Sequence, residues 1–389
     1  MTNDLLKWRR EFPILAKCTY LISNSLGAMP KGVYDELEEF ADLWATKGVV
    51  AWEDWVPMVQ STAELIASIV NAPKGTMIMH QNVSVLQHVL ISCFDFKGKR
   101  NKVVYSDLEF PTVHYNWKAR EKDGANVVIV KSPDGVHLPT ELMLREIDET
   151  TLVVPISYVL FRSAFIQDAR AIIQRAHEVG AVVVLDAYQA VGTIPVDVQD
   201  LNCDFMVGGS VKWLCGGPSG GYLYVRKDLI GKYEPKSCGW FSHEHPFNFD
   251  MDPIKYAPTV MRYMGGSPGV QGLYSTRPGY RIIKKVGVKA IRKRSMQMTA
   301  RIIERAREQG LVVNTPMDPA VRAGTVSVDF PGAEAACNEL IRRKFIVDYR
   351  PKAGVRISPH FYNTDDECDA IMDEIARIRL KAGKAGGRR

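Results

Sequence analysis

The sequence predicts an α/β fold in which a mostly parallel sheet is covered by helices on both faces. Short apolar runs, rich in β-branched residues and bounded by turn residues, recur between residues 102 and 226. The segments between them, such as DARAIIQRAHEVG, carry apolar residues at helical spacing. Strands that are apolar on both faces and are joined through helices are typical of a parallel sheet.

The expected elements follow one another in order along the chain. A helix at 83–94 precedes strands at 102–107, 126–131, 151–157, 181–187, 203–209 and 221–226, and a helix that stops at Gly180 lies among them. One long basic amphipathic helix is expected at 279–310. Strand-like runs at 325–330, 345–350 and 354–359, a helix around 337–343 and a closing helix then predict a smaller α+β domain.

These patterns divide the chain of 389 residues, which is long for a single compact core. Residues 1–45 are expected to form an N-terminal segment that packs with the small domain. Residues 46–265 form the large domain and residues 266–380 the small C-terminal domain. The last residues, 381–389, read KAGKAGGRR and are predicted to be a flexible tail.

Composition narrows the class of protein. The net charge of +6 comes from 50 basic and 44 acidic residues, and no basic stripe interleaved with aromatic residues indicates a nucleic-acid surface. The seven cysteines are scattered without a CxxC pair, which is typical of free thiols in a reducing compartment. No apolar run approaches the length that spans a bilayer, and the first residues do not resemble a secretion signal. We therefore expect a cytoplasmic protein.

Candidate functional residues follow the strands, because ligands of open parallel sheets collect beyond the carboxyl ends of the strands. Asp186 ends the run VVVLD, with Gln189 three residues later, and Lys212 follows the next strand among glycines. Lysine can form a Schiff base with an aldehyde, while an aspartate can keep a pyridine nitrogen protonated. The arrangement predicts a pyridoxal phosphate site, with Asp186 at the pyridine nitrogen and Gln189 at the ring hydroxyl.

Each of these residues has a plainer interpretation when taken alone. Asp186 would bind Mg²⁺ beside a nucleotide or cap the next helix, although the sequence has no GxxxxGK[ST] loop. Lys212 alone would be a solvated surface lysine. His243 and His245 share a face on a strand, but no third ligand or HExxH helix supports a metal site.

Several ordered motifs together point to a known family. They are NSLGAMP at 24–30, DLEFPTVHYNW at 107–117, DAYQAVG at 186–192, DFMVGGSVKWLCGGPSG at 204–220, GWFSHE at 239–244 and VRISPHFYNT at 355–364. With these motifs the chain resembles class V pyridoxal-phosphate enzymes of fold type I, and among them the kynureninase-like branch. The resemblance implies an enzyme with a large, mostly parallel sheet domain and a smaller α+β C-terminal domain.

The resemblance also implies a role for particular residues. Lys212 would carry the cofactor, Phe110 would stack on its ring, and Ser210 would donate a hydrogen bond to its phosphate. The turn that opens the helix at residue 83 would hold the phosphate on backbone N–H groups, as helix N-termini do. The residues of this turn are Asn82, Val83 and Ser84.

The substrate and the second subunit complete the implied site. Arg356 would bind the substrate carboxylate by two parallel hydrogen bonds, a task for which lysine is a poor substitute. Asn24, His114 and His243 are further candidates for contact with the substrate. Gly266, Ser267 and Trp240 would reach the cofactor phosphate of a neighbouring subunit, which implies a homodimer with shared active sites.

The chain departs from kynureninases at three positions. Val211 stands where they have a tyrosine before the lysine, Gln189 where they have a histidine, and Val113 where they have an acidic residue. A cysteine desulfurase needs a nucleophilic cysteine shortly before the carboxylate-binding arginine, and residues 342–356 contain none. Kynurenine itself is therefore not the expected substrate, and persulfide chemistry is disfavoured.

Three functions remain open at this point. The first is hydrolysis or lysis of a C–C or C–S bond in the side chain of a small amino acid, which needs an extra acid or base. Tyr188, His114 and His243 are the candidates for that group. The second is aminotransfer, for which Lys212 alone can move the proton. The third is a binding protein that has kept the fold without catalysis.

Overall fold

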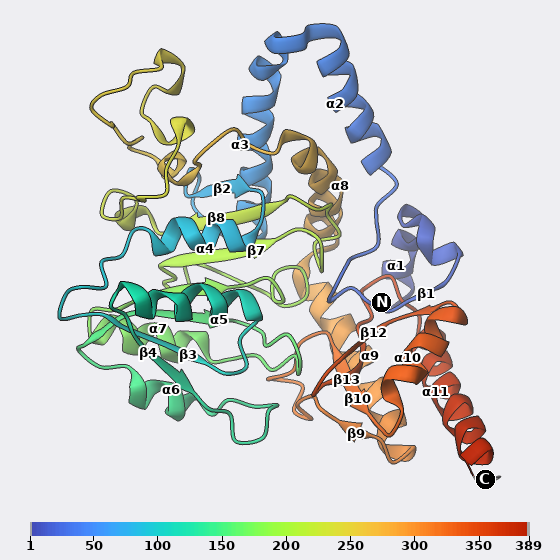
Figure 1. Cartoon of the computed structure of the whole chain (residues 1–389). Helices are drawn as coiled ribbons and strands as arrows, with labels where there is room; N and C mark the ends of the chain where they lie inside the picture. Colours follow the sequence, from blue (N-terminus) through green and yellow to red (C-terminus); the bar gives the residue numbers. More distant parts are fainter. Residues whose placement is uncertain (1, 387–389) are drawn as a thin grey trace.

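The computed structural model describes residues 2–386, and its large domain is built on a seven-stranded sheet (Figure 1). The strands lie in the order β2-β8-β7-β6-β5-β3-β4. Their bounds are Met77–His80 (β2), Lys102–Ser106 (β3), Asn126–Val130 (β4), Thr151–Ser157 (β5), Val182–Asp186 (β6), Phe205–Gly209 (β7) and Gly221–Val225 (β8). The strands from β4 to β7 pair in parallel, which confirms the predicted α/β class.

One edge of this sheet is antiparallel. The chain returns from β7 through residues 210–220 directly into β8, and so short a connection can only join antiparallel neighbours. β2 pairs antiparallel with the other side of β8. Every strand predicted between residues 102 and 226 is present to within two residues, whereas the sequence pattern did not identify β2, a run of only four residues.

Helices cover the sheet on both sides. In Figure 1, α4 (Val83–Ile91) and α5 (Pro111–Lys118) lie side by side along one face. The other helices between the strands are α6 (Thr140–Glu146) and α7 (Ala169–Glu178), which ends just before Gly180 as predicted. Before the sheet, α2 (Val33–Lys47) and α3 (Trp52–Ile69) form a hairpin that rises to the top of Figure 1.

A second, smaller sheet lies in the C-terminal part of the chain, in the order β12-β13-β10-β9. Its strands are β9 (Val312–Val313), β10 (Val326–Asp329), β12 (Asp348–Arg350) and β13 (Gly354–Ile357). α9 (Val288–Glu308), α10 (Ala333–Arg342) and α11 (Asp365–Gly386) pack around it. After α1 (Thr2–Leu6), the N-terminal segment joins this domain, because β1 (Thr19–Tyr20) pairs in parallel with β11 (Phe345–Ile346).

Two features of the C-terminal region differ from the sequence expectations. The long helix expected at 279–310 is two helices, α8 (Val270–Val286) and α9, which are separated by Gly287 at a φ of 85°. α8 packs against α2 and α3, and its buried residues, such as Leu273 and Tyr280, belong to the core of the large domain. The separate core of the small domain includes Met298 and later residues.

The predicted tail, residues 381–389, also begins differently. α11 continues to Gly386, so residues 381–386 extend the last helix, while residues 387–389 lie outside the described part of the chain. None of the described helices combines the length and the apolar character that a bilayer crossing requires.

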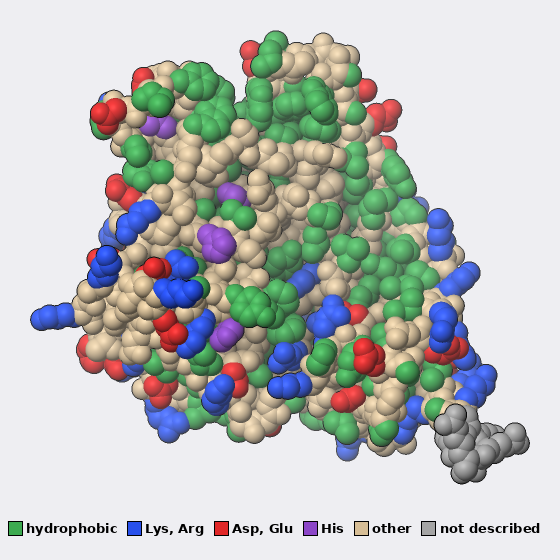
Figure 2. All heavy atoms as spheres, in the orientation of Figure 1, with side chains coloured by type: hydrophobic (Ala, Val, Ile, Leu, Met, Phe, Trp, Pro, Cys, Tyr) green, Lys and Arg blue, Asp and Glu red, His purple; other side chains and the backbone are tan. Residues whose placement is uncertain are grey.

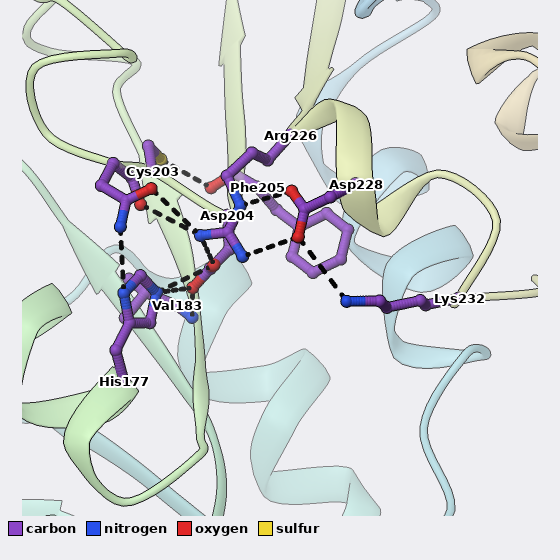
Figure 3. Close-up of polar contacts among 9 residues, drawn as sticks. His177, Val183, Cys203, Asp204, Phe205, Arg226, Asp228 and Lys232 are labelled. Carbon is purple, nitrogen blue, oxygen red and sulfur yellow. Dashed lines mark hydrogen bonds and ion pairs between the residues drawn. The ribbon is translucent and has the colours of Figure 1, made fainter.

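A buried ion pair network joins the amino ends of β6 and β7 to the carboxyl end of β8 (Figure 3). Asp204, fully buried just before β7, accepts hydrogen bonds from His177 Nε2 on α7 at 2.9 Å and from the Val183 backbone N–H on β6 at 2.8 Å. Its Oδ1 lies 2.7 Å from Arg226 Nη1, just after β8. A buried carboxylate needs such partners, so this network fixes three strands and a helix at the end of the sheet opposite the site.

Candidate active site

A cavity of about 200 Å³ lies at the carboxyl ends of β5 and β6 and at the turn that follows β7. It is lined by Asn82, Val83, Ser84, Phe110, Thr112, Ser157, Val159, Phe161, Asp186, Tyr188, Gln189 and Lys212. Parallel strands end at the same edge of a sheet, which is why residues distant in sequence meet here. The structure therefore brings together most of the residues that the sequence predicts for a cofactor.

Lys212 lies in an aromatic part of this cavity. Its Nζ is 4.3 Å from the ring centroid of Tyr188 and 5.6 Å from that of Phe110. Burial lowers the pKa of Lys212 to about 8, although the neighbouring carboxylate of Asp186 opposes this shift. Lysine in such a setting is neutral and nucleophilic at mildly alkaline pH, as attachment to an aldehyde requires.

Asp186 and Gln189 are both buried beside the cavity. Asp186 ends β6, and its Oδ1 accepts a hydrogen bond of 2.9 Å from the Tyr188 backbone N–H. Burial raises the pKa of Asp186, so a cationic partner would strengthen its ionised form. Gln189 donates through Nε2 to the Asn24 backbone oxygen at 3.0 Å, and its Oε1 accepts from Trp213 Nε1 at 3.0 Å.

The N-terminus of α4 faces the same cavity. Asn82 caps the helix by accepting a hydrogen bond from Val85 N–H, and the Ser84 hydroxyl lies 3.2 Å from that of Thr112. A Cβ atom at Gly221 would lie only 2.9 Å from Asn82 Cα, so glycine at the start of β8 lets this turn approach the sheet. The free N–H groups of the first turn and the dipole of the helix favour an anionic group, such as a phosphate.

Phe110 offers an exposed aromatic face. It stands at the N-cap of α5, directly before Pro111, and its side chain is 42% exposed. The Phe161 ring packs against it nearly at right angles, at a centroid distance of 5.1 Å. A flat ring held in this way suits stacking against another aromatic ring.

Some predicted residues lie outside the cavity. Ser210, expected to bind phosphate, is fully buried; its hydroxyl donates to the Gly220 oxygen at 2.5 Å and lies 2.6 Å from that of Tyr280. The structure therefore does not bring Ser210 to the cavity, because its hydroxyl is engaged by Tyr280 on α8 and by Gly220, the residue before β8. His114 does not line the cavity either, since its Nδ1 lies 3.1 Å from the Tyr105 hydroxyl.

The residues expected to act across a subunit interface lie on surface loops. Gly266 and Ser267 are exposed before α8, and Trp240 stacks on Phe249 at a centroid distance of 5.8 Å. His243, in the same loop as Trp240, does not line the cavity. A single chain does not test these roles, so they stay predictions.

Two further candidates lie just behind the cavity wall. Arg356 on β13 donates through Nη1 to the backbone oxygen of Phe161, a lining residue, at 2.9 Å. Asn24 is buried, and neither polar atom of its side-chain amide has a hydrogen-bond partner among residues 2–386. An unpaired buried amide is costly, so the Asn24 side chain is free to bind a ligand.

Sequence reasoning missed several residues of the site. Thr112 and Phe161 line the cavity but were not singled out. Ser157 ends β5 next to Asp186 on β6, so the rule that identified Asp186 would also have identified Ser157. Glu109 is buried behind the site, where its carboxylate accepts hydrogen bonds from the Ser106 hydroxyl at 2.9 Å and the Ser157 backbone N–H at 2.7 Å.

Comparison with known proteins agrees with this geometry. The family model for aminotransferase class-V matches residues 19–371. The chain belongs to the class-V aminotransferase family. This family consists of pyridoxal-phosphate-dependent enzymes, so the chain is an enzyme and pyridoxal phosphate is its cofactor.

The relatives of this class-V enzyme carry different names. An uncharacterized aminotransferase, YcbU, from Bacillus subtilis is 29% identical over 370 residues, which cover 95% of this chain and 97% of the relative. A kynureninase from Bacillus anthracis is 26% identical over 94% of this chain and 89% of its own length. The fold resembles that of an apo cysteine desulfurase from Thermococcus onnurineus NA1, with a TM-score of 0.85 and 20% identity over 96% of this chain and 97% of that one.

The residues of the cavity fit pyridoxal phosphate. The cavity combines a lysine, a buried carboxylate, an exposed aromatic face and a helix N-terminus, and each of these suits a different part of the cofactor. The glycine at position 221 lets the N-terminus of α4 lie close to the sheet. The fold type I architecture predicted from the motifs is thus confirmed for this class-V enzyme.

Proposed function

We propose that this class-V enzyme cleaves a C–C or C–S bond in the side chain of a small amino acid, as a kynureninase-like hydrolase or lyase. Such cleavage needs an acid or base in addition to the lysine that serves the α-carbon. The observation that carries the proposal is Tyr188, whose ring lies over Lys212 Nζ inside the cavity. The likeness to kynureninases over nearly the whole chain supports the same reaction class.

Tyr188 presents a protonated hydroxyl in the cavity. Burial raises the pKa of its phenol to about 12, so the hydroxyl keeps its proton at neutral pH. A Cβ atom at Gly209 would come within 2.5 Å of the Tyr188 hydroxyl, so the bare backbone of Gly209 makes room for the phenol. His114 and His243 lie outside the cavity, and this leaves Tyr188 as the stronger candidate.

The other roles follow from the positions of the side chains. Pyridoxal phosphate supplies an electron sink for the substrate when it is bound. Lys212 holds the cofactor and moves the proton at the substrate α-carbon, and Asp186 holds the ring nitrogen in its protonated form. Gln189 supports the ring hydroxyl, and the first turn of α4 holds the phosphate. Arg356 binds the substrate carboxylate, and the unpaired side-chain amide of Asn24 is a further contact for the substrate.

A second candidate function is aminotransfer on the same scaffold. It needs no acid or base beyond Lys212, and the relative named as an aminotransferase supports it. Val211, Gln189 and Val113 replace the residues that kynureninases have at these positions. Both functions use the same cofactor site, so products distinguish them better than cofactor binding does.

The enzyme is further proposed to act as a cytoplasmic homodimer with shared sites. Large hydrophobic side chains are exposed at the tip of the α2–α3 hairpin, among them Trp44 and Val49, and on the loop that contains Phe249 and Met251. Figure 2 shows hydrophobic side chains gathered on both upper projections of the molecule. Exposed apolar patches of this kind are typical of protein interfaces. A second copy bound there would bring Trp240, Gly266 and Ser267 of one subunit near the active site of the other.

The test is an absorption screen of the purified holoenzyme with the standard amino acids, followed by product analysis. Cleavage predicts a shortened amino acid and a released side-chain fragment, whereas conversion of the cofactor to its amine form with release of a keto acid would favour aminotransfer. Tyr188→Phe should slow cleavage about a hundredfold or more, as loss of acid–base assistance does. Tyr115→Phe, on the exposed face of α5, is the matched control and should leave the rate unchanged.

A further inference from the structure

The carboxylate-binding candidate Arg356 is held by a partner on the neighbouring strand. β12 and β13 are antiparallel, and their register places Asp348 directly opposite Arg356. Residues opposite each other in this way have their side chains on one face, about 5 Å apart at Cβ. Arg356 donates through Nε to Asp348 Oδ1 at 2.8 Å and through Nη2 to Oδ2 at 2.5 Å.

Arg356 keeps N–H groups that its protein partners do not use. A guanidinium has five N–H groups, one on Nε and two on each terminal nitrogen. Asp348 accepts two of them and the Phe161 backbone oxygen accepts a third, through Nη1. Within residues 2–386 these are the hydrogen bonds of Arg356, so Nη1 and Nη2 each keep one N–H group. A carboxylate forms a paired contact with two parallel N–H groups, one from each terminal nitrogen.

The charges around Asp348 fit a single carboxylate. Arg350 Nη2 lies 2.9 Å from Asp348 Oδ2, so one aspartate is shared by two arginines and the cluster has a net charge of plus one. The Arg356 side chain is only 3% exposed, and a buried cation of this kind depends on its partners. Asp348 therefore offsets one of the two positive charges and leaves the other for the substrate.

We propose that Asp348 is a positioning residue for substrate binding, which fixes the guanidinium of Arg356 so that its two remaining terminal N–H groups receive one α-carboxylate. This inference rests on the proposed role of Arg356 as the carboxylate-binding residue. The inference predicts a substrate that places a single carboxylate near Arg350, Arg356 and Asp348. A second acidic group there would be repelled by the carboxylate of Asp348.

A purely structural ion pair is the alternative, and the chain contains a pair with the same hydrogen-bond pattern at a more exposed place, where the side chains of Arg301 and Asp369 are 44% and 28% exposed. Arg301 on α9 donates to Asp369 on α11 through the same two nitrogens, Nε at 2.7 Å and Nη2 at 2.5 Å. This pair belongs to the same small domain but has no contact with the cavity. A variant of Asp369 therefore controls for the loss of an Arg–Asp pair as such.

The experiment titrates the holoenzyme with L-alanine and with L-alaninamide, which lacks the carboxylate, while following the visible absorption of the bound cofactor. For Asp348→Asn we expect the Kd of L-alanine to rise about tenfold, the effect of weakening a hydrogen bond to a charged group. The Kd of L-alaninamide should stay unchanged. Asp369→Asn should change neither Kd. Asp348→Glu keeps the charge and should restore part of the affinity for L-alanine.

The outcomes separate this inference from the proposed function. If Arg356→Lys leaves L-alanine binding unchanged, or if the wild type binds L-alanine no better than L-alaninamide, Arg356 is not the carboxylate-binding residue, and the inference about Asp348 fails with it, whereas cleavage chemistry at Tyr188 is untouched. If Arg356→Lys weakens L-alanine binding but Asp348→Asn does not, the clamp stands and the role of Asp348 is overturned. If Asp348→Asn does not fold, the test is made with Asp348→Glu, for which unchanged L-alanine binding would overturn the proposal.

Discussion

At the scale of single residues, the chemistry of the site depends on how Lys212 is surrounded. Burial lowers the pKa of its amine to about 8, whereas the carboxylate of Asp186 favours the charged form. Lys212 and Asp186 need different charge states. In their proposed roles, the lysine must lose its proton to attach the aldehyde, and the aspartate must keep its charge to hold the ring nitrogen.

This balance predicts how attachment of the cofactor depends on pH. The pKa of Lys212 is lowered to about 8, so the neutral fraction of its amine rises as the pH rises through that value. The rate at which cofactor-free protein takes up pyridoxal phosphate should therefore increase from pH 7 to 9 and level off. Stopped-flow absorption measures this rate. A rate that keeps rising towards pH 10.5, as for an ordinary lysine, would show that burial does not tune Lys212.

Val211 gives a second prediction at this scale. A tyrosine there would supply a hydroxyl beside the cofactor, whereas valine leaves an apolar wall. Because acid–base assistance is worth about a hundredfold to ten-thousandfold in rate, we expect kynurenine and 3-hydroxykynurenine to be poor substrates. Steady-state assays with both compounds decide this. A kcat/KM near ~10⁴ M⁻¹s⁻¹ or above, within the ordinary range for enzymes, would mean that Val211 is no impediment.

At the scale of secondary structure elements, the strands could be read from the sequence and several contacts could not. Asp186 and Lys212 were predictable because each follows a strand within a short local pattern. The partner of Ser210 was not, since Tyr280 lies on α8, seventy positions later. The break between α8 and α9 was in principle visible, because a glycine within a helix costs about 1 kcal/mol relative to alanine. The position of Asp348 opposite Arg356 could not be predicted, because it depends on the register between β12 and β13, which the sequence pattern does not determine.

The network around Asp204 gives a prediction for stability. Asp204→Asn removes the fully buried carboxylate that Arg226 and the Val183 backbone N–H contact, so it should lower the free energy of unfolding by about 3 kcal/mol. The control is Asp228→Asn, which removes a half-exposed partner of the same Arg226. Its effect should stay within about 0.5 kcal/mol, as is usual for surface changes. Denaturant unfolding of both variants measures the difference. Equal losses would show that burial of Asp204 adds nothing.

At the scale of the whole molecule, the exposed hydrophobic side chains of the hairpin and loop predict assembly. The mass in solution should be twice the 43.6 kDa of the chain. Trp44→Glu combined with Val49→Glu should shift the protein to monomer, because charges on an interface of this kind oppose association. Light scattering after gel filtration measures both. Val312→Glu, on an exposed residue of β9, is the control and should leave the mass unchanged.

The central claim is that the cavity at the carboxyl ends of the strands holds pyridoxal phosphate on Lys212. Borohydride reduction of the purified holoenzyme, followed by peptide mapping, tests it most directly, because reduction makes the attachment of the cofactor permanent. We predict that the peptide containing Lys212 carries the label. A label on Lys227 or Lys232 instead, or a holoenzyme in which no lysine is labelled, would contradict the account.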